Sequence, residues 1–177
     1  MRPVMTEDDL ARATRRIAHE IVERNHGLDD VLILGIPTRG KPFADRIAVA
    51  LSEIEGRTIV AGSLDIGMYR DDLDTRPKTR IGPTEIPEAL DGKVVILADD
   101  VLFTGRTIRA ALDALADIGR PAAVQLAVVV DRGHRQLPIR ADYVGKNIPT
   151  AATEHVAVRF SEIDDEDGVW MMNGGDS

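Results

Sequence analysis

The chain has 177 residues, a formal net charge of −8 and no cysteine. Its hydrophobic fraction of 44% and charged fraction of 29% are ordinary for a soluble globular protein, and its length suits one domain. The lack of cysteine excludes disulfides, thiolate metal sites and a cysteine nucleophile. The acidic balance excludes bulk nucleic-acid binding, so any RNA contact must come from a local basic patch. Because no apolar run reaches transmembrane length and the chain starts polar, we expect no membrane segment, no signal peptide and a cytoplasmic location.

The first third of the chain predicts alternating helices and strands. Residues 6–21 carry apolar side chains at helical spacing behind a capping Thr6, which predicts a helix that Asn25 and Gly27 end. The apolar run at 31–36 predicts a buried strand, and Pro42 suits the first turn of a second helix. Residues 58–66 are rich in β-branched side chains and predict another strand.

Residues 67–92 combine three prolines with many charges and few apolar side chains, which is typical of a functional lid or a disordered stretch. Beyond them, the pattern predicts strands at 94–98 and 122–130, a helix at 107–118, and weaker strands at 156–160 and 169–172. The acidic run at 162–167 lacks the glutamate that a calcium loop needs and predicts a solvated turn. Strands that alternate with helices predict an α/β fold with a mostly parallel central sheet flanked by helices.

The sequence GIPTRGKP, residues 35–42, nearly matches the G-x-x-x-x-G-K-[ST] pattern of nucleoside triphosphatases. Pro42 stands at the last position, where it offers neither a hydroxyl for Mg²⁺ nor an N–H for phosphate, so we reject that function. Gly35 and Gly40 instead bracket a tight turn that exposes Thr38 and Arg39 at the edge where such sheets bind ligands. The alternative is an ordinary strand–helix turn with a solvated arginine.

The segment VVILADDVLFTGRT, residues 94–107, carries the clearest chemistry. An apolar strand ends at Asp99 and Asp100, whose carboxylates can accept hydrogen bonds from vicinal sugar hydroxyls or approach a metal. Residues 104–107 offer backbone N–H groups, two hydroxyls and a guanidinium at a helix N-terminus, which are donors for a phosphate monoester. A capped helix after a solvated acidic pair is the alternative, but the whole string predicts a bound phosphorylated sugar.

This string resembles the phosphoribosyl-pyrophosphate signature of type I phosphoribosyltransferases. RIAHEI, GIPTRG, MYRDDL, ADDVLFTGRT and LAVVVDRGHRQLPIRADYVGKNIPT narrow the resemblance to the PyrR family, whose members are pyrimidine-operon attenuation proteins with uracil phosphoribosyltransferase activity. The resemblance covers residues 10–160, and DRGHRQLPIRADYVGKNIPT is its most specific piece. Many relatives carry lysine in place of Pro37 and threonine in place of Arg15. The resemblance implies the type I phosphoribosyltransferase fold in a single domain, residues 1–177, with residues 67–92 as a flexible lid loop.

The resemblance also implies a role for each matching residue. Asp99 and Asp100 would be the catalytic pair that holds the ribose hydroxyls, and Thr38 and Arg39 would bind pyrophosphate in a turn that often carries a cis peptide. Mg²⁺ would be bound mainly through the substrate pyrophosphate, with no metal site from the protein alone. The other substrate-binding positions would be Val101, Leu102, Phe103, Thr104, Gly105, Arg106 and Thr107 along the phosphoribosyl group, Arg132 and Val156 near the base, and Tyr69, Arg70 and Arg80 in the lid.

The first predicted helix presents Arg12, Arg15, Arg16 and His19 on one face. By itself this pattern favours a solvated face. The resemblance implies instead that the face binds pyrimidine-operon leader mRNA in a homodimer or higher homo-oligomer. Because the aromatic platforms of single-strand readers are missing, arginine contacts to phosphates would carry the binding, and affinity would fall steeply with salt.

Three functions stay open at this point. The first is a uracil phosphoribosyltransferase that converts uracil and phosphoribosyl pyrophosphate to UMP and pyrophosphate and also acts as a UMP-responsive attenuator. The second is an RNA-binding attenuator with vestigial catalysis. The third is a phosphoribosyltransferase for another base, against which the string at 131–150 argues.

Overall fold

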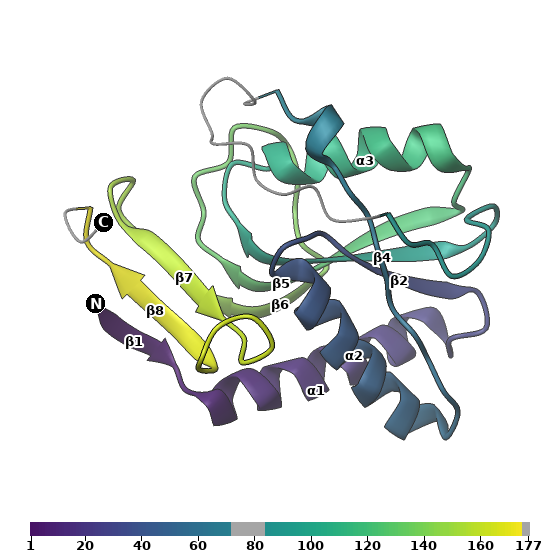
Figure 1. Ribbon diagram of the computed structural model, residues 1–177, viewed down its shortest axis with the longest axis horizontal. Coiled ribbons are helices and arrows are strands. Elements are labelled where there is room, and N and C mark those ends of the chain that lie inside the picture. The colour runs from purple at the N-terminus through teal and green to yellow at the C-terminus, as the bar shows by residue number, and fades with distance from the viewer. Residues whose placement is uncertain (72–83, 175–177) are drawn as a thin grey trace.

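The computed structural model describes residues 1–71 and 84–174, which form two β-sheets with helices packed on the larger one (Figure 1). The elements in chain order are β1 (Arg2–Met5), α1 (Glu7–Asn25), β2 (Val31–Gly35), α2 (Gly40–Glu55), β3 (Gly62–Ser63), the short 3-10 helix η1 (Gly67–Tyr69), β4 (Val94–Leu102), α3 (Arg106–Ile118), β5 (Ala123–Asp131), β6 (Tyr143–Asn147), β7 (His155–Arg159) and β8 (Gly168–Met172). The larger sheet has the strand order β3-β2-β4-β5-β6, and all its pairings are parallel. The predicted α/β fold with a mostly parallel central sheet is confirmed.

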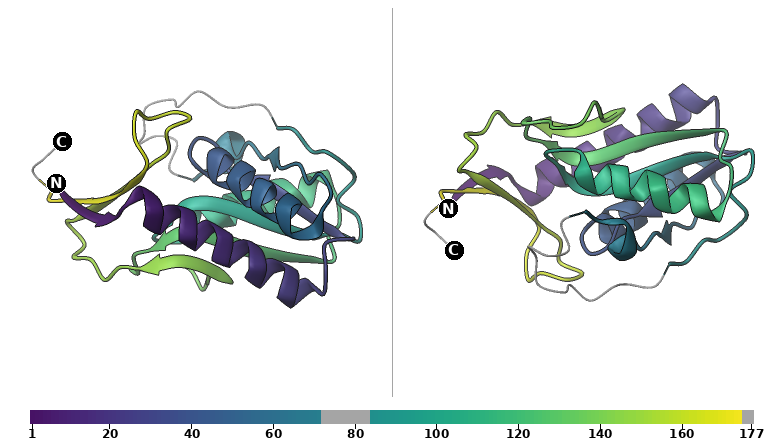
Figure 2. Two further views of the ribbon diagram at one scale, coloured as in Figure 1. Left: turned by 90° about the horizontal axis from the view of Figure 1, so that it is seen from below. Right: turned by 90° about the horizontal axis from the view of Figure 1, so that it is seen from above.

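Helices cover both faces of the large sheet, with α1 and α2 on one face and α3 on the other (Figure 2). Along β4, Ile96 and Ala98 join the core beneath α1 and α2, whereas Val95 and Leu97 join the core beneath α3. Because successive strand residues face opposite sides, a strand that is buried on both faces is an unbroken apolar run in the sequence. The runs predicted as strands at 31–36, 94–98 and 122–130 are accordingly the central strands β2, β4 and β5.

A second sheet, the small sheet, is antiparallel and has the order β1-β8-β7. It stands beyond one end of the large sheet and pairs the first strand of the chain with one of its last two (Figure 1). The strands predicted at 156–160 and 169–172 are confirmed as β7 and β8. β1 and β6 have no counterpart among the predicted elements.

The predicted helix starts rest on local signals that the structure confirms. Thr6 Oγ1 accepts a hydrogen bond from Asp9 N at 3.2 Å, and Asp9 Oδ2 accepts one from Thr6 N at 2.9 Å, which makes a capping box at the start of α1. α2 begins at Gly40, so that Pro42 lies in its first turn. None of the helices among the described residues has the length and apolar character needed to span a membrane.

The strand predicted at 58–66 is wrong for most of its length, because only Gly62 and Ser63 pair with β2. The residues before them turn back onto α2, where Ile59 N donates to Ser52 Oγ at 2.8 Å. On its other side Ser63 pairs with Glu85, which closes this edge of the sheet after two residues. Of the predicted lid segment, residues 72–83 lie outside the described residues.

Candidate functional site

The acidic pair lies within β4, near the carboxyl end of the strand. Asp99 is only 7% exposed and Asp100 is half-buried. Asp100 N donates to Asp99 Oδ1 at 2.9 Å, and Val101 N donates to Asp100 Oδ1 at 2.8 Å. Burial and the neighbouring Asp100 charge raise the pKa of Asp99 well above its usual range. Burial also raises the pKa of Asp100, although hydrogen bonds and the charge of Arg39 oppose the rise. Hydrogen-bond donors such as sugar hydroxyls, or a cation, would stabilise the charged forms of the two buried carboxylates.

The residues predicted to bind a phosphate form the turn into α3. Gly105 is the N-cap residue, with a left-handed φ of 92°, and the first turn of the helix follows directly. The segment 136–139 supports the turn from behind, since the amides of Gln136 and Leu137 donate to the Thr104 carbonyl at 3.0 and 3.2 Å. Only residues 101–105 separate the acidic pair from the first residue of α3, so the positive end of the helix dipole follows the pair closely along the chain.

The turn between β2 and α2 is packed directly on the acidic strand. It contains a cis peptide bond between Pro37 and Thr38, as the resemblance implies. A Cβ atom added at Gly40 would lie 2.4 Å from the Ala98 carbonyl oxygen, so a glycine is needed where α2 begins. This close approach sets Arg39 next to the end of β4.

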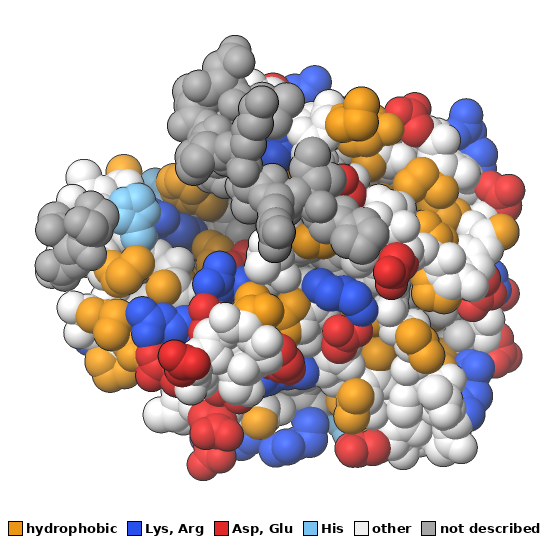
Figure 3. Space-filling view, viewed as in Figure 1, with side chains coloured by type: hydrophobic (Ala, Val, Ile, Leu, Met, Phe, Trp, Pro, Cys, Tyr) orange, Lys and Arg blue, Asp and Glu red, His pale blue; other side chains and the backbone are white. Residues whose placement is uncertain are grey.

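A cleft of about 680 Å³ separates the large sheet from the small sheet. Arg39 and Asp100 line it from the large-sheet side, Val156 lines it from β7, and residues of the β7–β8 loop, including Asp164, form its rim. Figure 3 shows acidic and basic side chains crowded together over this loop. The structure thus brings together three of the residues that the sequence singles out: Arg39 from the turn before α2, Asp100 from the large sheet and Val156 from the small sheet.

Sequence reasoning misses the part that the acidic run plays at this cleft. The predicted turn at 162–167 is confirmed, and four of its six residues are exposed. It is not simply solvated, because Asp164 pairs with Arg39 at 2.7 Å and both Glu162 and Asp167 pair with Arg46, at 2.6 and 2.7 Å. Partners 125 and 116 residues apart in the chain leave no local pattern. The charge complementarity with α2 becomes visible only once the loop is seen beside that helix.

Comparison with known proteins agrees with this geometry. Residues 6–162 match the family described as "Phosphoribosyl transferase domain". The chain is 62% identical over 171 residues to "Bifunctional protein PyrR" of Streptomyces coelicolor, which covers 96% of this chain and 89% of that protein. It is 56% identical over 179 residues to the protein of the same name from Leifsonia xyli, with 98% of each chain covered.

The chain belongs to the PyrR family. Among solved structures it is similar to a hypoxanthine phosphoribosyltransferase from Trypanosoma cruzi, with a TM-score of 0.74, 19% identity, and 98% and 95% of the two chains covered. A likeness at that identity supports the fold alone. The PyrR resemblance and the type I phosphoribosyltransferase fold predicted from the sequence are both confirmed.

Some of the residues matched to the PyrR family lie apart from the cleft. Arg132 is 5% exposed, donates from Nε to Thr150 Oγ1 at 3.1 Å, and lies 4.1 Å from the ring centroid of Phe103. It is not among the described residues that line the cleft. Burial lowers the pKa of Arg132, and the half-exposed Phe103 ring covers its guanidinium. Arg132 and Phe103 therefore form a second group beside the turn into α3.

The residues of the predicted lid segment that the structure describes contact α3 or lie near the acidic pair. The Tyr69 hydroxyl donates to Asp117 Oδ2 at 2.7 Å, and this hydrogen bond raises the pKa of Tyr69. The pKa of Asp99 is raised overall by burial, and the charge of Arg70 opposes this rise, so the Arg70 guanidinium lies within electrostatic range of the acidic pair. Arg106 donates to Asp71 Oδ2 at 2.7 Å, so the start of the lid segment is tied to the turn into α3. Arg80 lies outside the described residues.

The basic face of α1 is exposed as predicted for this PyrR-family chain. Arg12, Arg15, Arg16 and His19 are all exposed. Arg12 pairs with Asp9 and Arg16 with Glu20, each at 2.7 Å. Arg16 also donates to the Val144 and Gly145 carbonyls at 3.1 and 2.8 Å, which ties the face to β6.

Proposed function

We propose that this PyrR-family chain transfers the phosphoribosyl group of phosphoribosyl pyrophosphate (PRPP) to uracil, and that it also binds pyrimidine-operon leader RNA in response to UMP. The observation that carries the enzymatic proposal is one sheet edge that holds three complementary groups. These are the buried Asp99–Asp100 pair, the helix N-terminus at Gly105, and Arg39 at the mouth of the cleft. A 5′-phosphorylated ribose with a pyrophosphate group at C1′ needs all three.

Each group has a part in the reaction. Asp99 and Asp100 accept hydrogen bonds from the ribose hydroxyls, residues 104–107 bind the 5′-phosphate, and Thr38 and Arg39 bind pyrophosphate. The C1′–O bond breaks with its electron pair leaving on pyrophosphate, and uracil N1 attacks C1′ and releases its proton to water. The protein stabilises the departing anion and aligns the reactants, without forming a covalent bond to either. Uracil would lie in the cleft beside Val156.

Mg²⁺ fits the donor chemistry of this edge only in part. The carboxylates of Asp99 and Asp100 are the oxygen donors that Mg²⁺ prefers. Among residues 1–71 and 84–174, however, no group of three His, Cys, Asp or Glu side chains could hold a metal. We therefore propose that Mg²⁺ binds mainly through the substrate pyrophosphate, where it would neutralise charge on the leaving group.

The test of catalysis is pyrophosphate release from PRPP with uracil as the acceptor. Asp100→Asn keeps the acceptor for Val101 N, so we expect an intact fold and a turnover that falls by orders of magnitude. Asp113→Asn, at an exposed carboxylate on α3, is the matched control and should keep wild-type turnover. Wild-type turnover in Asp100→Asn refutes the role of the pair. Hypoxanthine and orotate as competing acceptors test the base, and UMP binding without pyrophosphate release would instead favour a regulator with vestigial catalysis.

The regulatory part of the proposal depends on the basic face of α1. Binding of leader RNA, with and without UMP, should weaken steeply as salt rises, because arginine contacts to phosphates release counterions. Arg15→Gln removes an exposed charge from this face and should weaken binding and flatten the salt slope. Arg57→Gln, at an exposed arginine on another surface, is the control. Equal affinity for leader and scrambled RNA refutes specific attenuation, and sedimentation of the free protein tests the proposed homodimer or higher assembly.

A further inference from the structure

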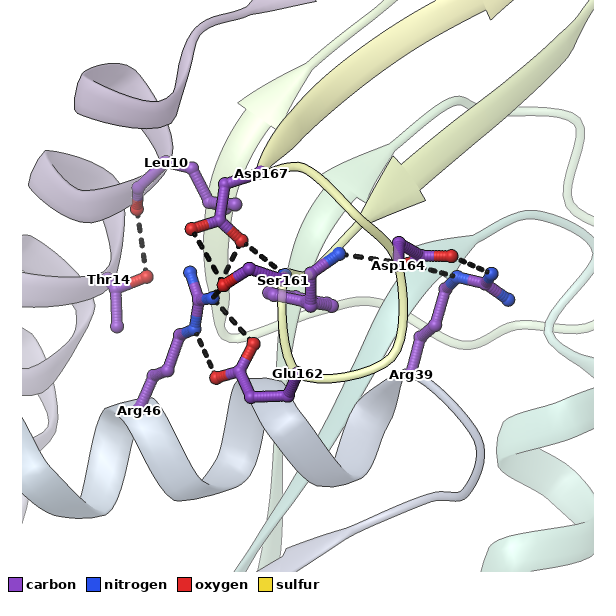
Figure 4. Close-up of polar contacts among 9 residues, drawn as sticks. Leu10, Thr14, Arg39, Arg46, Ser161, Glu162, Asp164 and Asp167 are labelled. Atoms are coloured by element: carbon purple, nitrogen blue, oxygen red, sulfur yellow. Dashed lines mark hydrogen bonds and ion pairs between the residues drawn. The ribbon is translucent and has the colours of Figure 1, made fainter.

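The loop between β7 and β8 is fixed to α2 at two points (Figure 4). Arg39 donates from Nη2 to Asp164 Oδ1 at 2.7 Å and from Nε to Asp164 Oδ2 at 3.3 Å. Arg46, seven residues and about two helical turns later, donates to Glu162 and Asp167. The guanidinium of Arg46 also lies 5.0 Å from the centroid of a buried ring, that of Phe160. Both arginines extend toward the loop, so α2 and the rim of the cleft hold each other in place.

The carboxylate of Asp164 has a fixed position of its own. Its Oδ2 accepts a hydrogen bond from Phe160 N at 2.9 Å, and its side chain is only 17% exposed. Phe160 is fully buried and its ring stacks on that of Phe43 in α2, with the centroids 6.3 Å apart. Burial raises the pKa of Asp164, but the hydrogen bonds from Arg39 and Phe160 outweigh it and bring the pKa below its usual value. Asp164 is therefore an ionised and anchored acceptor at neutral pH.

The pair uses only one edge of the Arg39 guanidinium. Asp164 takes the Nε–Nη2 edge, while Nη1 makes no hydrogen bond to any of the residues that the structure describes. A guanidinium has five N–H donors, so this edge can be held by a carboxylate while the other donors bind a second anion. The Arg39 side chain is 39% exposed and lines the cleft together with Asp100. An anion can thus reach Arg39 without displacing Asp164.

We propose that Asp164 is a positioning residue for pyrophosphate binding, which holds Arg39 so that its remaining donors point into the cleft. This inference rests on the proposed function, because it assigns Arg39 to the pyrophosphate of PRPP. Asp164 touches no reacting atom in this role. The ion pair with Asp164 already restricts the rotamers of Arg39 before the ligand arrives. Binding of pyrophosphate then costs less side-chain entropy than it would with a freely moving arginine. Its own negative charge opposes the binding of an anion, so positioning and simple electrostatics predict opposite effects when that charge is removed.

Asp164→Asn separates the two effects. The amide oxygen still accepts from Phe160 N, but the ionic hold on Arg39 is lost. We expect the KM for PRPP to rise about fivefold to tenfold, the scale of restoring freedom to one long side chain, with the KM for uracil unchanged. Asp167→Asn makes the same change in the same loop at a partner of Arg46, and should leave the KM for PRPP unchanged. A KM for PRPP that stays the same or falls in Asp164→Asn overturns the proposal.

A double-mutant cycle with Arg39→Ala shows whether Asp164 acts through Arg39. We expect Asp164→Asn to have no further effect on the KM for PRPP in the Arg39→Ala background, and an undiminished effect there overturns the proposal. If Arg39→Ala alone leaves the KM for PRPP unchanged, the assignment of this loop in the proposed function fails. If Arg39→Ala raises it and Asp164→Asn does not, only the positioning role fails. Should Asp164→Asn not fold, Asp164→Glu keeps the charge but shifts it, and a wild-type KM for PRPP in that variant overturns the proposal.

Discussion

Gly40→Ala tests whether the start of α2 must lie directly on the acidic strand. The added Cβ would lie 2.4 Å from the Ala98 carbonyl oxygen, about 1 Å closer than the 3.4 Å at which ordinary contact begins. It would also lie 3.2 Å from the Asp99 Cα atom, so the atoms that must move are backbone atoms of β4. At an ordinary helical position, replacing glycine by alanine stabilises a protein by about 0.5–1 kcal/mol. The structure predicts the opposite sign here.

The expected cost is set by overpacking, which typically amounts to about 1–3 kcal/mol. A contact of 2.4 Å with backbone belongs in the upper half of that range, about 2–3 kcal/mol. After the helical gain is subtracted, we expect a net loss of about 1–2.5 kcal/mol in the free energy of unfolding, or about 2–10 °C in Tm for a chain of this length. The displaced backbone carries Asp99, so PRPP should also bind more weakly. Thermal melts, urea titrations and calorimetric PRPP binding measure these effects.

Gly119→Ala is the matched control for this substitution. Gly119 has an extended backbone with φ −175°, and its added Cβ would meet only side chains, at 3.1 Å from Leu90 Cβ and 3.2 Å from Asp91 Oδ1. Because these contacts are short by only a few tenths of an ångström, compared with about 1 Å at Gly40, we expect a change below about 1 kcal/mol and normal PRPP binding. A Gly40→Ala variant that melts at or above the wild-type Tm refutes the reasoning.

Three further substitutions probe burial and charge. Tyr143→Phe removes a buried hydroxyl that donates to Gln125 Oε1 at 2.6 Å, so urea titration should show a loss of about 1 kcal/mol with unchanged turnover. In the folded chain burial raises the pKa of Asp99 above its unfolded value of about 3.9. Between these two pKa values the unfolded chain binds fewer protons than the folded chain, so the stability of the wild type falls as pH rises. Asp99→Asn has no carboxyl group to titrate at this position, so its stability relative to wild type should increase from about pH 4 to about pH 7. An equal difference in stability at the two pH values would contradict the raised pKa of Asp99. Arg46→Met leaves Glu162 and Asp167 in the β7–β8 loop without their partner and should lower the free energy of unfolding by about 2 kcal/mol, less than the loss of a fully buried ion pair. An unchanged Tm would disprove this prediction.

The central part of the fold could be predicted from the sequence because its signals are local. The apolar runs of β2, β4 and β5 are long enough to be buried on both faces, and Thr6 begins α1 with a capping side chain. The carboxylates near the end of β4 and the glycine and threonines after it are likewise contained in one short segment. A site built along a single strand and the turn after it leaves its chemistry in consecutive residues.

The rest depends on contacts between distant segments. β6 contains Gly145, and a Cβ added there would lie 2.5 Å from the Val129 carbonyl oxygen. The pairing with β5 therefore requires a glycine in the middle of β6, and this glycine interrupts the sequence pattern of a strand. β1 has only four residues and includes Pro3, which a strand tolerates at a sheet edge but which weakens the pattern. The pairing of Arg39 with Asp164 joins two stretches that each read as solvated charge. Only their juxtaposition reveals an ion pair at the rim of the cleft.

The order of strands in the small sheet has a consequence for how the protein is made. Among the strands that the structure describes, its middle strand, β8, is synthesised last, and it lies between β1, which is synthesised first, and β7. During translation the five parallel strands and their helices can therefore assemble before β1 has a partner. The small sheet that bounds the cleft therefore forms last, so a nascent chain acquires the turn into α3 well before the cleft has its second wall.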